Sequence, residues 1–263
     1  MPWLLPALAL TAYTVATVTL LWRLFHPAGP NFKLTFSAGT AAVVLHMLAL
    51  VDSIFTGQGQ NFSLLNVSSL VCWLLTLSVT LTSLRSPAVL LLPLVYGCAA
   101  LILLASLLFP VSVQLQHLEQ NAGLLVHIAI AFTAYVVLIM ATLYSIQVSY
   151  ISYKLKQKNF SGVSRFLPPL LQAENLQFRL LAAGTLLLAL ALLSGIPFMT
   201  DWIDHKSLLS LLALVLFGAL SWGHARLGWR GKTAITLTIS GSVLLTLAYF
   251  GSRFVKEVLL GRF

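Results

Sequence analysis

Charged residues are scarce in this sequence. They make up 8% of its 263 residues, whereas hydrophobic residues make up 59%, and soluble domains usually carry about 25% charged residues. This composition excludes an ordinary soluble domain and predicts an all-α protein that crosses a membrane several times. At about 20 residues per crossing, the length allows seven to nine spans and leaves no room for a sizeable soluble part. We therefore expect a single membrane domain over residues 1–263.

Cysteines and enzyme signatures are also few. The two cysteines, Cys72 and Cys98, both lie in apolar runs. The sequence has no CxxC pair for thiol exchange and no CxxCH for covalent haem attachment. The HExxH, GxSxG, P-loop and GxGxxG signatures are missing as well, which argues against zinc proteolysis, serine hydrolysis and nucleotide binding. We expect that the protein is not an enzyme.

Acidic residues are outnumbered by basic ones, six against fifteen, for a formal net charge of +9. The basic residues cluster in alternate loops between the apolar runs, namely at Arg23, Lys33, Arg85, five positions within residues 154–179, and Arg226, Arg230 and Lys232. Such clustering marks the cytoplasmic side of a membrane protein and gives no reason to expect a nucleic-acid site. It predicts eight spans, with the N- and C-termini both external.

The apolar runs give the expected boundaries of these spans. They are residues 3–22, 34–51, 64–84, 88–109, 122–153, 180–198, 207–223 and 233–249. The fifth run would be about 48 Å long if fully helical, which exceeds the hydrocarbon core. Before the sixth run, Pro168 and Pro169 predict the start of a short amphipathic helix on the membrane surface.

Two histidines lie at the same predicted depth within the spans. His46 and His127 are each about five residues, or roughly 8 Å, below the external surface. Ionisable residues within a span point to function, and two imidazoles on facing helices could bind one haem iron. Gly123, Ala131 and Tyr135 share a stripe with His127, which would let a macrocycle or another helix come close. Equally, each histidine could simply hydrogen-bond a neighbouring helix.

Three further residues are candidates for binding. His224 lies at the opposite membrane face from His127, where it is either an interfacial residue or part of a second, inner haem site. Trp202 and Asp204, in an external loop, could line the outer site by facing a porphyrin and by hydrogen-bonding an imidazole. The alternative for Trp202 is an anchor at the membrane interface, where it would contact lipid.

The sequence resembles the cytochrome c assembly protein family, which includes haem-handling membrane proteins of the CcsA, CcmC and HemX-like types. The resemblance rests on the run DHKSLLSL, on HARLGWRGKTA, and on YFG at residues 249–251. FSLLNVSSL from Phe62, LLPLVY from Leu91, GLLVHI from Gly123 and LPPLLQAE from Leu167 extend it over nearly the whole chain.

This resemblance implies that His127 is an external-side haem ligand and that His224 is a histidine within the membrane-spanning bundle. The family's tryptophan-rich haem loop, which ends in WDPK, is shortened here to Trp202-Ile203-Asp204-His205-Lys206. The family's late external histidine has no counterpart after Tyr249. Assigning His46 as the replacement ligand is an inference from its position, and the resemblance does not imply it.

These features support one leading hypothesis and two alternatives. The first is a membrane protein that binds haem b without a covalent bond and takes part in haem handling or cytochrome c maturation. The second is an accessory protein for ion or metal transport or efflux, in which the intramembrane histidines bind metal or relay protons. The third is a structural partner of another membrane protein, in which the histidines only pack.

Overall fold

The computed structural model describes residues 3–24, 26, 29–56, 59–84, 90–109, 115–116, 121–158, 167–198 and 205–255. Within these ranges, eight helices are long and apolar enough to cross a membrane, which confirms the predicted number of spans. Large apolar side chains such as Leu101 and Leu186 are exposed on their outer surfaces. This is the pattern of helices that face lipid. Trp202 and Asp204 lie outside the described residues.

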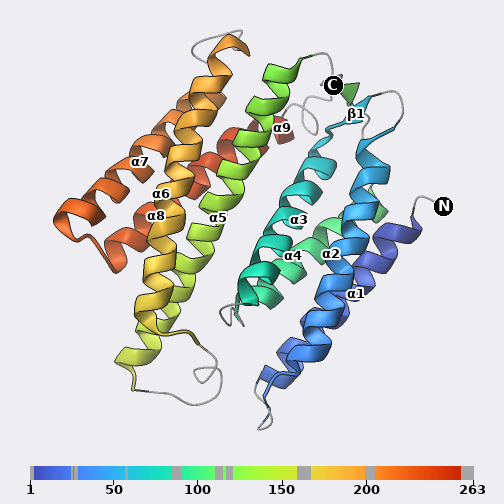
Figure 1. Cartoon of the computed structure of the whole chain (residues 1–263), viewed down its shortest axis with the longest axis horizontal. Coiled ribbons are helices and arrows are strands. Elements are labelled where there is room, and N and C mark those ends of the chain that lie inside the picture. Colours follow the sequence, from blue (N-terminus) through green and yellow to red (C-terminus); the bar gives the residue numbers. More distant parts are fainter. Residues whose placement is uncertain are drawn as a thin grey trace. The chain divides into compact units, whose positions relative to one another are not determined.

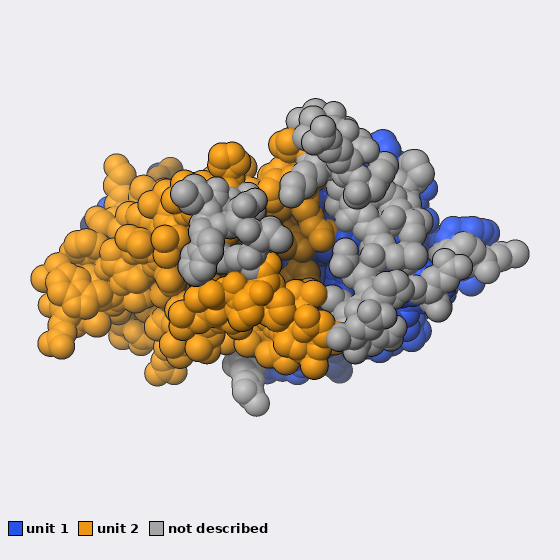
Figure 2. All heavy atoms as spheres, turned by 90° about the horizontal axis from the view of Figure 1, so that it is seen from above, with its two compact units in different colours: residues 1–117, 154–168 blue, residues 118–153, 169–263 orange. Residues whose placement is uncertain are grey.

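The described helices form two compact units, coloured separately in Figure 2. Unit 1 comprises Met1–His117 and Lys154–Pro168, and unit 2 comprises Leu118–Tyr153 and Pro169–Phe263. The expectation of a single domain stays a prediction.

Unit 1 contains four of the helices able to span a membrane, labelled α1 to α4 in Figure 1. They are α1 (Leu4–Leu24), α2 (Phe32–Ile54), α3 (Leu64–Ser83) and α4 (Leu91–Leu108). Helix α1 packs on α2 and α4, and α3 packs on α2 and α4. A short antiparallel pair, β1 (Gln60–Asn61) with β2 (Leu115–Gln116), follows the ends of α2 and α4. The four helices therefore enclose one core.

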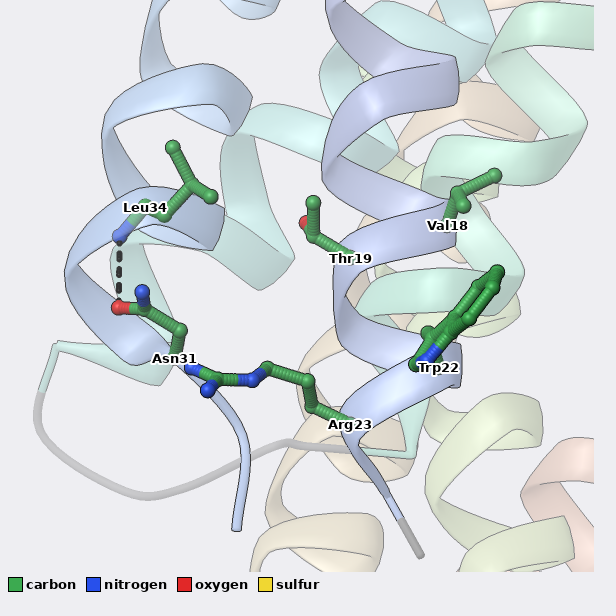
Figure 3. A pocket seen from close by; sticks show the side chains of 6 residues that line it. All are labelled: Val18, Thr19, Trp22, Arg23, Asn31 and Leu34. Atoms are coloured by element: carbon green, nitrogen blue, oxygen red, sulfur yellow. Dashed lines mark hydrogen bonds between the residues drawn. The ribbon is translucent and has the colours of Figure 1, made fainter. Parts of the chain in front are cut away.

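A groove of about 280 Å³ opens between α1 and α2, where α1 ends and α2 begins (Figure 3). It is lined by Val18, Thr19, Trp22, Arg23, Asn31 and Leu34. The side chain of Asn31 accepts a hydrogen bond from the Leu34 backbone N–H at 3.3 Å and caps α2. None of the described residues that line this groove is a histidine.

Unit 2 contains the other four spans. They are α5 (Ala122–Lys156), α6 (Leu170–Gly195), α7 (His205–Leu227) and α8 (Lys232–Thr246), and α5 belongs to unit 2 up to Tyr153. The 3-10 turn η3 (Ile196–Phe198) extends α6, and the π-helix η4 (Leu247–Gly251) and α9 (Ser252–Phe254) continue α8. Helix α7 packs on α6 and on α8. Two glycines allow neighbouring helices to pack closely. A Cβ on Gly184 of α6 would lie 2.7 Å from Leu138 of α5, and one on Gly241 of α8 would lie 2.7 Å from Phe217 of α7.

Two boundaries differ most from the sequence-based expectation. Pro169 caps α6, but no separate surface helix follows, because α6 runs without a break from Leu170 through the sixth span. The expectation of a short helix before Leu180 was therefore wrong. The last span is longer than predicted and reaches Phe254, with the π-helix in its final part. The polar residues at the start of α6 do not interrupt the helix because they are good helix formers.

Candidate functional site

His127 lies near the start of α5, at the end of unit 2 where α5 and α7 begin and α6 ends. We call this the His127 end. Asn121 fixes the start of α5, because its side-chain oxygen accepts a hydrogen bond from the Leu124 backbone N–H at 3.1 Å. His127 follows after about one and a half turns, and its side chain is partly exposed.

The hydrogen bonds around His127 determine which ring nitrogen carries the proton. Its Nδ1 lies 3.0 Å from the hydroxyl oxygen of Ser194, near the end of α6. The Ser194 hydroxyl donates its one proton to the carbonyl of Ala191, at 3.0 Å. Nδ1 must therefore be the donor to Ser194, and Nε2 keeps its lone pair. The backbone of Ala191 is a further hydrogen-bond partner of the imidazole.

Gly195 and Phe198 complete the wall beside this imidazole. A Cβ on Gly195 would lie 2.8 Å from Cε1 of His127, so only glycine leaves room for the ring in this position. The Phe198 ring lies with its centroid 6.1 Å from the imidazole centroid and tilted by 40°. The end of α6 thus fixes the orientation of His127 through one hydrogen bond and two contacts.

Cationic and aromatic side chains gather at the same end of unit 2. Lys206, in the first turn of α7, is close enough to His127 to act on it electrostatically. Its Nζ lies 5.2 Å from the ring centroid of Tyr249, which belongs to the π-helix η4. Phe132 of α5 meets Tyr249 edge to face, at 6.0 Å between centroids. This end therefore combines an imidazole, aromatic rings and positive charge.

His224 lies at the opposite end of unit 2, at the end of α7. Its Nδ1 is 3.0 Å from the carbonyl oxygen of Trp229, and a carbonyl can only accept, so Nδ1 carries the proton here too. The ring stacks on Phe178 of α6, with centroids 3.4 Å apart and planes 7° from parallel. Phe178 and Ser194, the α6 partners of the two histidines, are sixteen positions apart, which is about 24 Å of helix. His127 and His224 therefore cannot share one ligand atom.

The turn beside His224 is fixed by its glycines and by an ion pair. Gly228 and Gly231 have φ values of +67° and +63°, in the left-handed region that favours glycine. The ring of Trp229 packs directly on Gly223, where any side chain would collide with it. Arg230 forms an ion pair with Glu174 of α6 at 3.7 Å. This end is built as a packed corner between α6, α7 and α8.

His46 is fully buried in unit 1 and has a partner at each ring nitrogen. Its Nε2 lies 2.8 Å from the Ser69 hydroxyl and its Nδ1 lies 3.3 Å from the Tyr13 hydroxyl. Tyr13 is also 2.9 Å from Thr76, whose hydroxyl donates to the Trp73 carbonyl.

This geometry gives the chain of hydrogen bonds a direction. Because Thr76 uses its proton on a carbonyl, it must accept from Tyr13, so Tyr13 accepts from His46 Nδ1 and Ser69 donates to His46 Nε2. Every group is satisfied with a neutral imidazole. Ligation of a metal by Nε2 of His46 would require the Ser69 hydrogen bond to break. The assignment of His46 as an iron ligand stays a prediction.

The structure also places the stripe that contains His127. Gly123 and His127 both face the end of α6, where a Cβ on Gly123 would lie 3.2 Å from the Phe198 ring. Tyr135 turns to α8 instead and lies 2.9 Å from the Thr246 hydroxyl. The stripe thus serves helix packing over much of its length. In the described residues, no group of three or more His, Cys, Asp or Glu side chains is arranged to hold a metal ion.

The π-helix η4 and the contacts of Lys206 and Arg253 with Tyr249 were not anticipated from the sequence. A π-helix has no reliable sequence signature, although such turns occur often at functional sites. The YFG run at residues 249–251 lies in this π-helix.

The described residues thus contain eight helices able to span a membrane, with two histidines held through their Nδ1 atoms at opposite ends of one unit, and these features define a multi-pass membrane protein. Residues 34–260 match the family described as cytochrome C assembly protein. The chain belongs to this cytochrome c assembly family, as its sequence resemblance predicted.

Curated relatives agree with this assignment. The chain is 37% identical over 258 residues to the inner membrane protein YpjD of Escherichia coli K12, covering 96% of this chain and 97% of that protein. YpjD of Escherichia coli O157:H7 matches equally well. An uncharacterized 28.8 kDa protein of Azospirillum brasilense is 39% identical over 141 residues, covering 51% of this chain and 52% of that protein. No solved structure matches the chain. With its eight spans, the chain is a multi-pass inner-membrane protein.

Proposed function

We propose that this protein is not an enzyme but a haem-binding membrane protein that holds or passes haem b, without a covalent bond, at the His127 end of unit 2. In this topology the His127 end faces the periplasm, and both termini lie on that side. Membership of the cytochrome c assembly family supports a role in haem handling. The recipient would be another membrane protein or an apocytochrome.

The orientation of His127 is the observation that carries this proposal. A neutral imidazole binds haem iron through a nitrogen lone pair, and its other nitrogen is commonly held by a hydrogen bond that fixes the tautomer. His127 meets both conditions, since Nδ1 donates to Ser194 and Nε2 keeps its lone pair. The adjacent Phe198 ring and the charge of Lys206 also suit a flat, apolar ligand with acidic groups. The residues present therefore fit haem.

The other predicted residues take secondary roles in this proposal. Trp202 and Asp204 would line the same site from the loop that precedes α7. His224 would belong to a second, inner haem site at the other end of unit 2, since its Nε2 also keeps its lone pair. His46, as the predicted second iron ligand, would have to give up the hydrogen bond between its Nε2 and Ser69.

An absorbance spectrum with pyridine haemochrome quantification, on detergent-purified protein expressed with ample haem, tests the proposal. We expect a b-type signal near one or two haems per chain, with a Soret band that weakens in His127→Ala. The matched control is His26→Ala, which removes an exposed histidine of unit 1. A wild-type protein without haem under these conditions would overturn the proposal and favour the ion-handling or accessory role.

A further inference from the structure

The groove between α1 and α2 in unit 1 combines apolar walls with a positively charged end. Val18 and Trp22 of α1 and Leu34 of α2 supply the apolar surface, and all three side chains are exposed. Arg23 and Asn31 supply the polar part, and in Figure 3 the Arg23 side chain extends from α1 toward Asn31 at the start of α2. Among the described residues that line the groove, none is acidic.

The groove lies where two membrane spans end together. The apolar span of α1 covers Leu4–Arg23, and that of α2 begins at Phe32. The apolar walls therefore lie within the spans, whereas Arg23 lies at their common edge. Hydrocarbon surrounds the apolar part of a span, and polar headgroups surround its ends. The exposed Trp22 beside Arg23 fits this level, because tryptophan is enriched at the boundary between membrane and water.

The polar end of the groove carries hydrogen-bond donors. The side-chain oxygen of Asn31 caps α2 by accepting a hydrogen bond from the Leu34 backbone N–H at 3.3 Å, so the amide NH2 of the same side chain can donate elsewhere. The guanidinium of Arg23 has five N–H donors in a planar fork that fits two oxygens of a phosphate. The Arg23 side chain is partly buried, and a cation beside hydrocarbon is stabilised by an anion that meets it.

We propose that this groove binds one anionic phospholipid, with its phosphate on Arg23 and Asn31 and an acyl chain along Val18 and Leu34. A phospholipid has the same two parts at the same two levels of the membrane. Free phosphate would meet only the charged end, and a zwitterionic lipid would bring a second cation close to Arg23. The bound lipid would hold the end of α1 against the start of α2.

Native mass spectrometry of the purified full-length protein tests this inference. The protein is titrated in detergent with phosphatidylglycerol and with phosphatidylcholine of the same acyl chains, and the readout is the dissociation constant of the first bound lipid. We expect the wild type to bind phosphatidylglycerol about fivefold more tightly, which is the contribution of one basic side chain near an anionic lipid. Arg23→Gln should lose this preference and keep its affinity for phosphatidylcholine.

The controls separate binding in the groove from general attraction between opposite charges. Lys33→Gln removes a neighbouring exposed charge that does not line the groove, and it should keep the preference. Arg23→Lys keeps the charge without the planar fork and should keep only part of the preference. Val18→Trp fills the groove and should weaken binding of both lipids. Leu8→Trp, at an exposed position about 15 Å away on the same helix, should bind both lipids as the wild type does.

Equal affinity of the wild type for the two lipids would overturn the proposal, and so would an equal loss of preference in Arg23→Gln and Lys33→Gln. Displacement of the bound lipid by millimolar inorganic phosphate would show that the site recognises phosphate alone, which would also refute it. Thermal unfolding of each variant distinguishes a loss of fold from a loss of the lipid. The proposed haem function does not depend on these results, because the groove lies in unit 1 and His127 in unit 2.

Discussion

Replacing Gly195 with alanine is the sharpest single perturbation of the His127 site. The added Cβ would lie 2.8 Å from Cε1 and 3.3 Å from Nδ1 of His127, where ordinary contacts begin near 3.4 Å. The imidazole must then move by about 0.6 Å, the difference between 2.8 and 3.4 Å, or the backbone of α6 must shift. Either change displaces the ring from its hydrogen bond with Ser194.

The size of the effect follows from the strain on the ring. Forcing a side chain about 30° away from its preferred rotamer costs about 0.5–1.5 kcal/mol of conformational energy. If binding depends on the observed ring position, haem affinity should fall by about two- to tenfold. The matched control is Gly218→Ala on α7, where an added Cβ meets nothing within 4 Å. Its haem affinity should equal that of the wild type.

Haem titration in detergent, followed by the Soret change, measures both variants under the same conditions. Thermal unfolding of the haem-free proteins reports whether Gly195→Ala alters stability by more than its local strain. The reasoning would be refuted if Gly195→Ala bound haem as tightly as Gly218→Ala. In that case the observed position of His127 would not be the one that binds iron.

Three further predictions concern stability, measured by thermal unfolding in detergent. Ser69→Ala should lower the free energy of unfolding by about 1 kcal/mol, because it leaves a buried nitrogen of the His46 imidazole without its donor. The control Ser68→Ala, which removes a hydroxyl bonded to Leu64 of the same helix, should change stability little. Equal losses in the two variants would contradict the hydrogen-bonded chain around His46. Gly39→Ala should lower the free energy of unfolding by about 1–3 kcal/mol, because the added Cβ would collide with the buried Tyr96 ring. A melting temperature equal to that of the wild type would contradict this packing. Glu174→Gln should change stability by less than about 1 kcal/mol, since its ion-pair partner is exposed, and a larger loss would reveal a stronger structural role for that corner.

The apolar runs were sufficient to predict the eight spans, because hydrocarbon requires continuous helices with internally paired backbones. The start of α6 was harder to predict. Residues 170–179 include Glu174 and Arg179, so hydropathy alone suggested a surface helix, whereas the helix continues because nothing in that segment breaks it. Hydropathy locates the membrane boundary, and it does not locate the helix end.

Depth along a span does not by itself determine the partners of His46 and His127. The sequence predicts a similar depth for both residues, yet a side chain's partners depend on the rotation of its helix and on which helices are neighbours. His46 meets Tyr13 and Ser69 within unit 1, whereas His127 meets Ser194 within unit 2. His127 and Ser194 are 67 positions apart in the sequence, so no local sequence pattern predicts their hydrogen bond.

The most direct test of His127 as an iron ligand is chemical rescue of His127→Gly with free imidazole. We predict that this variant loses the wild-type Soret position and intensity, and that millimolar imidazole restores both by occupying the space of the missing side chain. His26→Gly should keep the wild-type spectrum with or without imidazole. A His127→Gly protein whose oxidised and reduced spectra match the wild type without imidazole would contradict the account.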